Sequence, residues 1–160
     1  MSRTGAFPFS GPTSRDAAVT ATITTRDNSV RVSGVGAGTG AVIAEVYDAT
    51  PNNAFTTATP RLVNVSVLKE IGAGFTVGFV VGGQTTRTVL IRAVGPGLIP
   101  LGVTGTVADP RLSFFSGPTK TDENDNWGGT VTLTAAMAQV GAFALPAASR
   151  DATLLATLQP

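Results

Sequence analysis

The two ends of the chain carry the same short motifs, and this internal repeat constrains the fold more than any other feature. The tripeptide Gly-Ala-Phe at residues 5–7 recurs at residues 141–143. The tetrapeptide Ser-Arg-Asp-Ala at residues 14–17 recurs at residues 149–152, and a weaker match continues over residues 19–23 and 154–158. We therefore expect the chain to begin late in one copy of a module of about 135 residues and to end partway through the next.

The repeat predicts a division of the chain into three parts. Residues 1–49 would supply the terminal strands of one sandwich module, and residues 61–160 the opening strands of the next. Residues 50–60 contain mainly Thr, Asn, Ala and Pro without apolar alternation, which is typical of a linker. The third part has no later counterpart of residues 28–48, so we expect other polypeptide to complete its module.

Alternating apolar residues indicate short β-strands that bury one face. Residues 42–47 and 88–94 are more continuously apolar, which is typical of central strands covered on both faces. Gly and Pro clusters between the stretches supply turns. The remaining predicted strands are residues 30–33, 63–67, 75–81, 112–115 and 153–158.

One segment favours a helix instead of a strand. Ala135, Ala136 and Met137 lie within residues 132–140, and Gly141 could end a short helix there. Seven or eight short strands with frequent turns are typical of a sandwich. The sequence thus predicts an all-β fold, an antiparallel β-sandwich of jelly-roll or immunoglobulin-like type, with one short helix.

The composition narrows the chemistry of the chain. Cys and His are both absent, which removes disulfides, thiolate nucleophiles, imidazole bases and nearly every zinc or copper site. Charged residues make up 13% and the net charge is +1, which gives no electrostatic footprint for nucleic acid or an anionic membrane. No apolar run approaches the roughly 20 residues of a membrane span. We expect no enzyme activity and no organic cofactor.

The acidic residues suggest two further features, an ion pair and a calcium site. Arg92 could form a surface pair with an acid such as Asp109. Oxygen ligands are densest near residue 122, where calcium is the metal to consider, but Trp127 and Leu133 stand where a twelve-residue calcium loop needs Gly and Glu. The sequence therefore predicts a polar turn closed by Trp127, with calcium as the alternative. The candidate calcium ligands are Asp122, Asn124, Asp125 and Asn126.

Several motifs together resemble the β-sandwich modules that occur in tandem in very large secreted and cell-surface bacterial proteins. The resemblance covers almost all of the chain in permuted order, and it implies an extracellular or cell-surface location without supplying any catalytic residue. The motifs that carry it are residues 42–48, 60–66, 89–96, 108–110 and 124–127.

The leading functional hypothesis is a structural subunit that binds copies of itself head to tail. An incomplete module exposes apolar core and unpaired backbone groups, and strands donated by the next chain would cover both. Closure within one chain would instead give a monomer. The residues of the donated strands are Val30, Val32, Val42, Ala44, Val46 and Tyr47. The residues of the duplicated strand, which could accept them, are Leu154, Leu155 and Leu158.

A second hypothesis is a monomeric extracellular sandwich that binds a glycan or another surface partner. Such sites usually present exposed aromatic side chains, and Trp127 is the sole tryptophan. The scarcity of Trp and Tyr argues against such a site, and glycan-array binding that is abolished by a change of Trp127 would favour it.

Overall fold

The computed structural model describes residues 13–15, 17–23, 28–33, 35–36, 40–49, 54, 56–59 and 61–160. The chain divides into two compact units, Met1–Gly72 and Ala73–Pro160. The boundary falls within the stretch predicted to open the second module. The first repeat copy at residues 5–7, Asp16 and most of the predicted linker lie outside the described residues.

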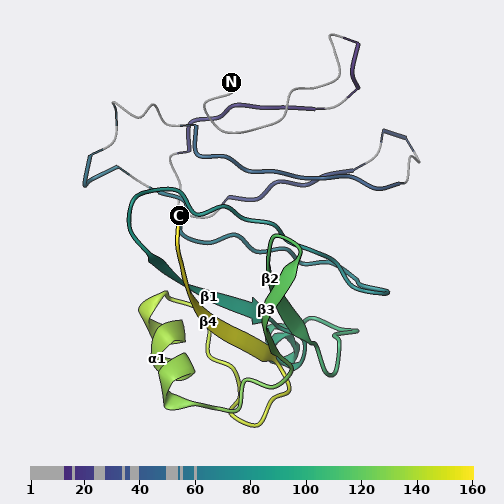
Figure 1. Ribbon diagram of the computed structural model, residues 1–160. Coiled ribbons are helices and arrows are strands. Elements are labelled where there is room, and N and C mark those ends of the chain that lie inside the picture. The colour runs from purple at the N-terminus through teal and green to yellow at the C-terminus, as the bar shows by residue number, and fades with distance from the viewer. Residues whose placement is uncertain are drawn as a thin grey trace. The chain divides into compact units, whose positions relative to one another are not determined.

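The centre of the second unit is an antiparallel pair of strands, β1 (Arg87–Ala93) and β4 (Ala152–Leu158) (Figure 1). The register pairs Arg87 with Leu158 and Ala93 with Ala152. Both strands confirm the predictions from apolar patterning, with a shift of one residue. The second copy of the repeat thus forms the start of β4.

A β-hairpin follows β1 in the chain. It consists of β2 (Leu112–Ser116) and β3 (Thr119–Asn124), with an irregularity between Phe114 and Phe115. Gly117 lies in the turn with φ +55°, a conformation that favours glycine. Strand β2 was predicted, whereas β3 contains no apolar residue and was interpreted as a polar turn.

The α-helix α1 (Val131–Gln139) confirms the predicted helix to within one residue. Thr130 caps its first turn, because the hydroxyl of Thr130 accepts the backbone N–H of Leu133 at 3.3 Å. Gly141 has φ +70° just beyond the helix end, as the sequence predicts. A short 3-10 helix, η2 (Pro96–Leu101), occupies the Gly-Pro-Gly region that was predicted as a turn.

Residues 89–93 of β1 are partly buried, with contacts on both faces, but in the described structure β1 pairs with β4 alone and is not the central strand that its continuous apolar run predicts. Ile91 and Ala93 pack with the buried cluster of Leu112, Ala152 and Leu154. Leu90 and Val94, which alternation directs to the other face, pack with a second cluster. The second cluster consists of Trp127, Met137 and Leu145. The hairpin and the helix thus supply the two layers that enclose β1 and β4.

Other predicted strands are not formed in the structure. Residues 30–33, 42–47, 63–67 and 75–81 are all described, and none is part of a β-ladder. Burial of residues 42–47 on both faces is also wrong, since Val42 is 72% exposed. Alternation specifies a face for burial but supplies no hydrogen-bonding partner, and a strand needs both. The described residues form a β-rich fold with small antiparallel sheets and little helix.

Candidate functional site

The second copy of the Ser-Arg-Asp-Ala motif forms a buried polar site. Asp151 is 0% exposed, and its Oδ1 accepts the backbone N–H of Gly95 at 2.7 Å. The backbone N–H of Gly97 donates to both carboxylate oxygens, at 3.1 and 3.0 Å. A carboxylate that accepts backbone N–H groups compensates for its own burial. Asp151 thereby fastens the start of η2 to the start of β4.

Two further residues complete this polar site. The hydroxyl of Ser149 donates to Oδ2 of Asp151 at 2.6 Å. The indole N–H of Trp127 lies 3.1 Å from both the Ser149 hydroxyl and the carbonyl oxygen of Pro146. In addition, the backbone N–H of Trp127 donates to the carbonyl of Asp151 at 2.8 Å. The repeated motif therefore anchors the aromatic core as well as η2.

The glycines at this site are required by close packing. A Cβ atom on Gly97 would lie 2.7 Å from Cδ2 of Leu145 and 2.9 Å from Oδ2 of Asp151. A Cβ atom on Gly95 would lie 2.0 Å from the carbonyl oxygen of Val107. The missing side chain of Gly97 thus leaves room for the carboxylate of Asp151, whereas that of Gly95 leaves room for the backbone of Val107.

Arg92 lies beside this site and does not pair with Asp109, so that prediction is wrong. Its Nη1 donates to the carbonyl of Phe143 at 2.7 Å, and its guanidinium lies 4.3 Å from the centre of the Phe143 ring. Burial lowers the pKa of Arg92, and the charge of Asp151 partly opposes this shift. Asp109 pairs instead with Arg150 at 2.9 Å.

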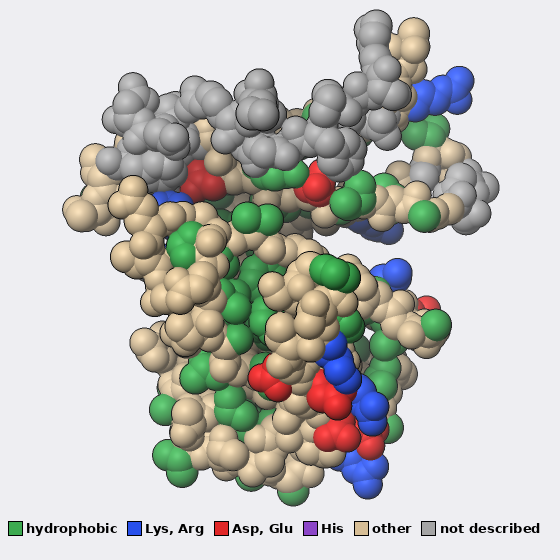
Figure 2. Space-filling model, in the orientation of Figure 1, with side chains coloured by type: hydrophobic (Ala, Val, Ile, Leu, Met, Phe, Trp, Pro, Cys, Tyr) green, Lys and Arg blue, Asp and Glu red, His purple; other side chains and the backbone are tan. Residues whose placement is uncertain are grey.

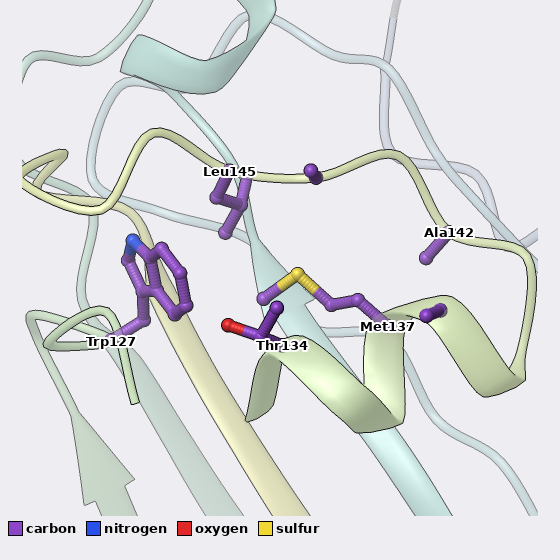
Figure 3. Close-up of a pocket in the computed structure, with 7 residues that line it drawn as sticks. Trp127, Thr134, Met137, Ala142 and Leu145 are labelled. Atoms are coloured by element: carbon purple, nitrogen blue, oxygen red, sulfur yellow. The ribbon is translucent and has the colours of Figure 1, made fainter. Parts of the chain in front are cut away.

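A small pocket lies between α1 and the loop that precedes β4. Figure 3 shows Trp127 and Leu145 facing the side chain of Met137 across it. Its volume of about 140 Å³ is below the range of about 300–1,000 Å³ usual for small-molecule sites. Trp127 is only 4% exposed, so its ring is a core residue and cannot stack on a sugar in this fold. The pocket therefore does not favour glycan binding.

The proposed calcium ligands are engaged in structural contacts. Asn124 Oδ1 accepts the backbone N–H of Thr153 at 2.9 Å, and Asn124 Nδ2 donates to the carbonyl of Asn126 at 3.0 Å. Asp122 accepts the backbone N–H of Glu123, while Asp125 lies 3.9 Å from Arg111. The contacts of Asp122 and Asn124 are thus to backbone groups, and that of Asp125 is to a side chain. In the described part of the chain, no three acidic side chains are grouped to hold a metal ion.

The outer edge of β4 is the side of this strand that faces away from β1. Within the described residues, β4 forms a ladder with β1 alone. The N–H of Thr153 points away from β1, because it donates to Asn124. Since N–H directions alternate along a strand, those of Leu155 and Thr157 point to the same outer edge.

This edge lacks two of the features that normally prevent strand addition, charged residues and proline. The β4 sequence Ala-Thr-Leu-Leu-Ala-Thr-Leu contains neither a charged residue nor proline. Figure 2 shows charged side chains of both signs gathered on one side of the second unit. The ion pairs there are Arg111–Asp125, Lys120–Glu123 and Arg150–Asp109, none of which belongs to β4. Strand β4 itself carries none of these charges, although β3, which contains Lys120 and Glu123, reaches the start of its outer edge through the Asn124–Thr153 hydrogen bond.

The predicted donor residues lie in the first unit and are exposed. The exposed apolar side chains include Val30, Val32, Val42, Val46 and Tyr47. The hydroxyl of Tyr47 donates to Glu45 at 3.0 Å, and this bond raises the pKa of Tyr47. The predicted acceptor residues divide between the two sides of β4: Leu154 is in the core and Leu155 is 40% exposed.

Sequence reasoning identified the Ser-Arg-Asp-Ala repeat but missed the role of Asp151 in binding Gly95 and Gly97. The motif itself was visible in the sequence, because this tetrapeptide is the longest identical block of the repeat and the Gly-Pro-Gly segment stands out as a turn.

No described helix is long and apolar enough to cross a membrane. No protein-family model, curated protein or solved structure matches this chain.

Proposed function

We propose that the chain is a structural subunit of an extracellular filament or surface array, without enzymatic activity, in which subunits associate head to tail by β-strand complementation. The observation that carries this proposal is the outer edge of β4, which is uncharged, free of proline and, among the residues that the structure describes, outside any ladder. An edge of this kind binds extended polypeptide, because each added strand satisfies its free backbone groups.

The donated strands would come from residues 30–33 and 42–47 of another chain. Their apolar side chains are exposed, with Val30 at 73% and Val42 at 72%. Addition to a sheet would bury these side chains and would contribute about 25 cal/mol for each Å² of apolar surface removed from water. Donor and acceptor are different surfaces of the chain, so the contact would repeat from subunit to subunit without closing.

The extracellular location in this proposal is supported by the resemblance to tandem modules of secreted and surface bacterial proteins. The neutral surface, rich in Thr and Gly, is consistent with that setting. A structural role also agrees with the buried site, where Asp151 is fully occupied by backbone and hydroxyl donors.

The acceptor edge is tested by Leu155→Lys, which places a charge at the centre of β4 on a partly exposed side chain. The control is Val131→Lys, at an 86% exposed position on α1. We expect the unmodified chain and the control to form large species in sedimentation velocity and fibres in negative-stain microscopy. Leu155→Lys should remain small. A single small species for the unmodified chain at all concentrations would contradict the proposal.

The donor is tested by Ala44→Pro, which removes a ladder N–H within residues 42–47. The control is Val35→Pro at a 99% exposed bend. Loss of assembly in the first variant and its retention in the second would support donation by this segment. Equal assembly of both would exclude it.

A further inference from the structure

We propose that residues 14–23 of one chain can replace residues 149–158 of a second copy, with residues 17–23 forming the strand that pairs with β1. This inference rests on the proposed self-association and goes beyond it, because it places a strand of one copy in the position of β4 in another and not only beside it. It follows because the residues of the second copy that make contacts have matching residues at the equivalent positions of the first copy.

The first copy contains every side chain that the repeated motif contributes to the buried polar site. Ser149, Asp151 and Ala152 correspond in sequence to Ser14, Asp16 and Ala17. Asp151 binds the N–H groups of Gly95 and Gly97, and Ser149 binds Asp151. Ala152 is 0% exposed, so its place accepts no larger side chain, and the first copy also has alanine.

The flanking arginine is preserved as well. Arg150 pairs with Asp109 at 2.9 Å, and Arg15 occupies the corresponding sequence position. The first copy therefore has the same hydroxyl, carboxylate, small residue and cation that the second copy brings to the buried polar site and its surface.

The strand that follows also preserves the pattern of β4. Buried Leu154 corresponds to Val19, and exposed Leu155 corresponds to Thr20. The hydroxyls of Thr157 and Thr88 lie 3.0 Å apart across the two strands, and Thr22 corresponds to Thr157. Residues 17–23 would thus keep the inside and outside faces of β4 and one of its cross-strand contacts.

One difference between the copies favours the first. The hydroxyl of Thr153 is buried without a hydrogen-bond partner. The first copy has Ala18 at this position, which removes the unpaired hydroxyl and leaves the backbone N–H for Asn124. An unpaired buried hydroxyl destabilises a fold, so replacement of Thr153 by the equivalent Ala18 does not oppose the exchange.

Residues 17–23 are accessible for the exchange. They are exposed and form no ladder, with Val19 at 86% and Ile23 at 58% exposure. Residues 30–33, the first proposed donor, follow shortly after in the sequence. A chain that places residues 17–23 against β1 would therefore bring its donor segment to the outer edge of the same sheet. Exchange of equivalent elements between copies is a low-cost route to association.

The Thr88–Thr157 contact provides a direct test, because the chain has no native cysteine. A full-length chain carrying Thr88→Cys is mixed with one carrying Thr22→Cys, under a thiol–disulfide buffer, and followed by non-reducing electrophoresis. The control replaces Thr22→Cys with Ala21→Cys, whose side chain would face the opposite side of the strand. We expect the mixed disulfide to form about tenfold faster for Thr22→Cys than for Ala21→Cys, because cross-strand geometry limits the reaction.

Two added substitutions test whether the buried site directs the exchange. Asp16→Asn in the Thr22→Cys chain should reduce the mixed disulfide, because it weakens binding to Gly95 and Gly97. Asp151→Asn in the Thr88→Cys chain should increase it, because it weakens the competing β4. Equal yields with and without Asp16→Asn would overturn the role assigned to the motif.

The outcomes separate this inference from the proposed function. If the chain assembles in sedimentation but Thr22→Cys cross-links no faster than Ala21→Cys, the exchange is overturned and the proposed self-association is not. Loss of both would overturn the two proposals together. A disulfide that forms only within single chains carrying both Thr22→Cys and Thr88→Cys would place residues 17–23 in their own chain, contrary to exchange between copies.

Discussion

Both carboxylate oxygens of Asp151 lie within hydrogen-bonding distance of the same backbone nitrogen, that of Gly97, at 3.1 and 3.0 Å. This contact joins two segments that are 54 residues apart in the chain. It connects the beginning of η2, just after β1, with the beginning of β4. The buried site is thus a fastening between the paired strands, and its loss should affect the whole second unit.

Removal of the carboxylate by Asp151→Ala should strongly destabilise the second unit. The N–H groups of Gly95 and Gly97 would be left buried without partners, at a cost of about 3 kcal/mol or more in the free energy of unfolding. Asp109→Ala is the control, because it removes an exposed partner of Arg150 and should cost less than about 1 kcal/mol. Urea unfolding measures both values, and equal costs would contradict the role of Asp151.

Substitution of Gly97→Ala should destabilise the fold by overpacking. The added methyl group would lie 2.7 Å from Leu145 and 2.9 Å from Asp151, and relief of this crowding should cost about 1–3 kcal/mol. Gly78→Ala is the matched control, since a Cβ there meets nothing within 4 Å. Thermal unfolding should show a lower midpoint for Gly97→Ala than for Gly78→Ala, and coincident midpoints would contradict the close packing.

Replacement of Thr153→Val should stabilise the chain. The valine keeps the size of the buried threonine and removes its unpartnered hydroxyl, for a gain of about 1 kcal/mol. Thr157→Val is the control, because that hydroxyl contacts Thr88 and lies near the surface. A loss of unfolding free energy in Thr153→Val would show that the buried hydroxyl has a partner in solution.

The cap of α1 gives a smaller effect. Thr130→Ala leaves the N–H of Leu133 without its side-chain acceptor and should cost about 1 kcal/mol of unfolding free energy. Thr132→Ala, within the same helix, should change this free energy by less than about 0.5 kcal/mol. If the two variants unfold alike in urea, Thr130 does not act as the cap.

The Lys120–Glu123 pair on β3 predicts a pH-dependent contribution. The hydrogen bond from Lys120, at 2.7 Å, and its charge lower the pKa of Glu123. Because the folded pKa is depressed, this contribution is present above the unfolded pKa and is lost as the pH falls through the folded pKa. Lys120→Met should raise the pKa of Glu123 in an NMR titration, whereas Arg150→Met should leave it unchanged. An unaltered pKa in Lys120→Met would contradict the pairing.

The elements with a clear apolar pattern were predictable. Strands β1, β2 and β4 carry alternating or continuous apolar residues, and α1 contains helix-forming alanines followed by Gly141. Strand β3 was missed because its six residues are all polar and its position is set by pairing with β2. The role of Asp151 was missed because its partners lie far away in the sequence.

The predicted strands that did not form have the correct pattern but no pairing partner within the described structure. Phe79, in one of them, stacks on Phe114 with ring centres 6.2 Å apart, although residues 75–81 form no ladder. Periodicity therefore identified segments with an apolar face. It could not determine whether backbone partners for residues 30–33 and 42–47 come from the same chain or from another copy.

Hydrogen exchange at the outer edge of β4 tests the central claim most directly. The amides of Leu155 and Thr157 point to this edge, whereas those of Leu154 and Ala156 point toward β1. Raising the protein concentration should slow exchange at Leu155 and Thr157 by about tenfold or more, with little change at the other two. Exchange rates at Leu155 and Thr157 that stay the same from dilute to concentrated solution would contradict strand addition at this edge.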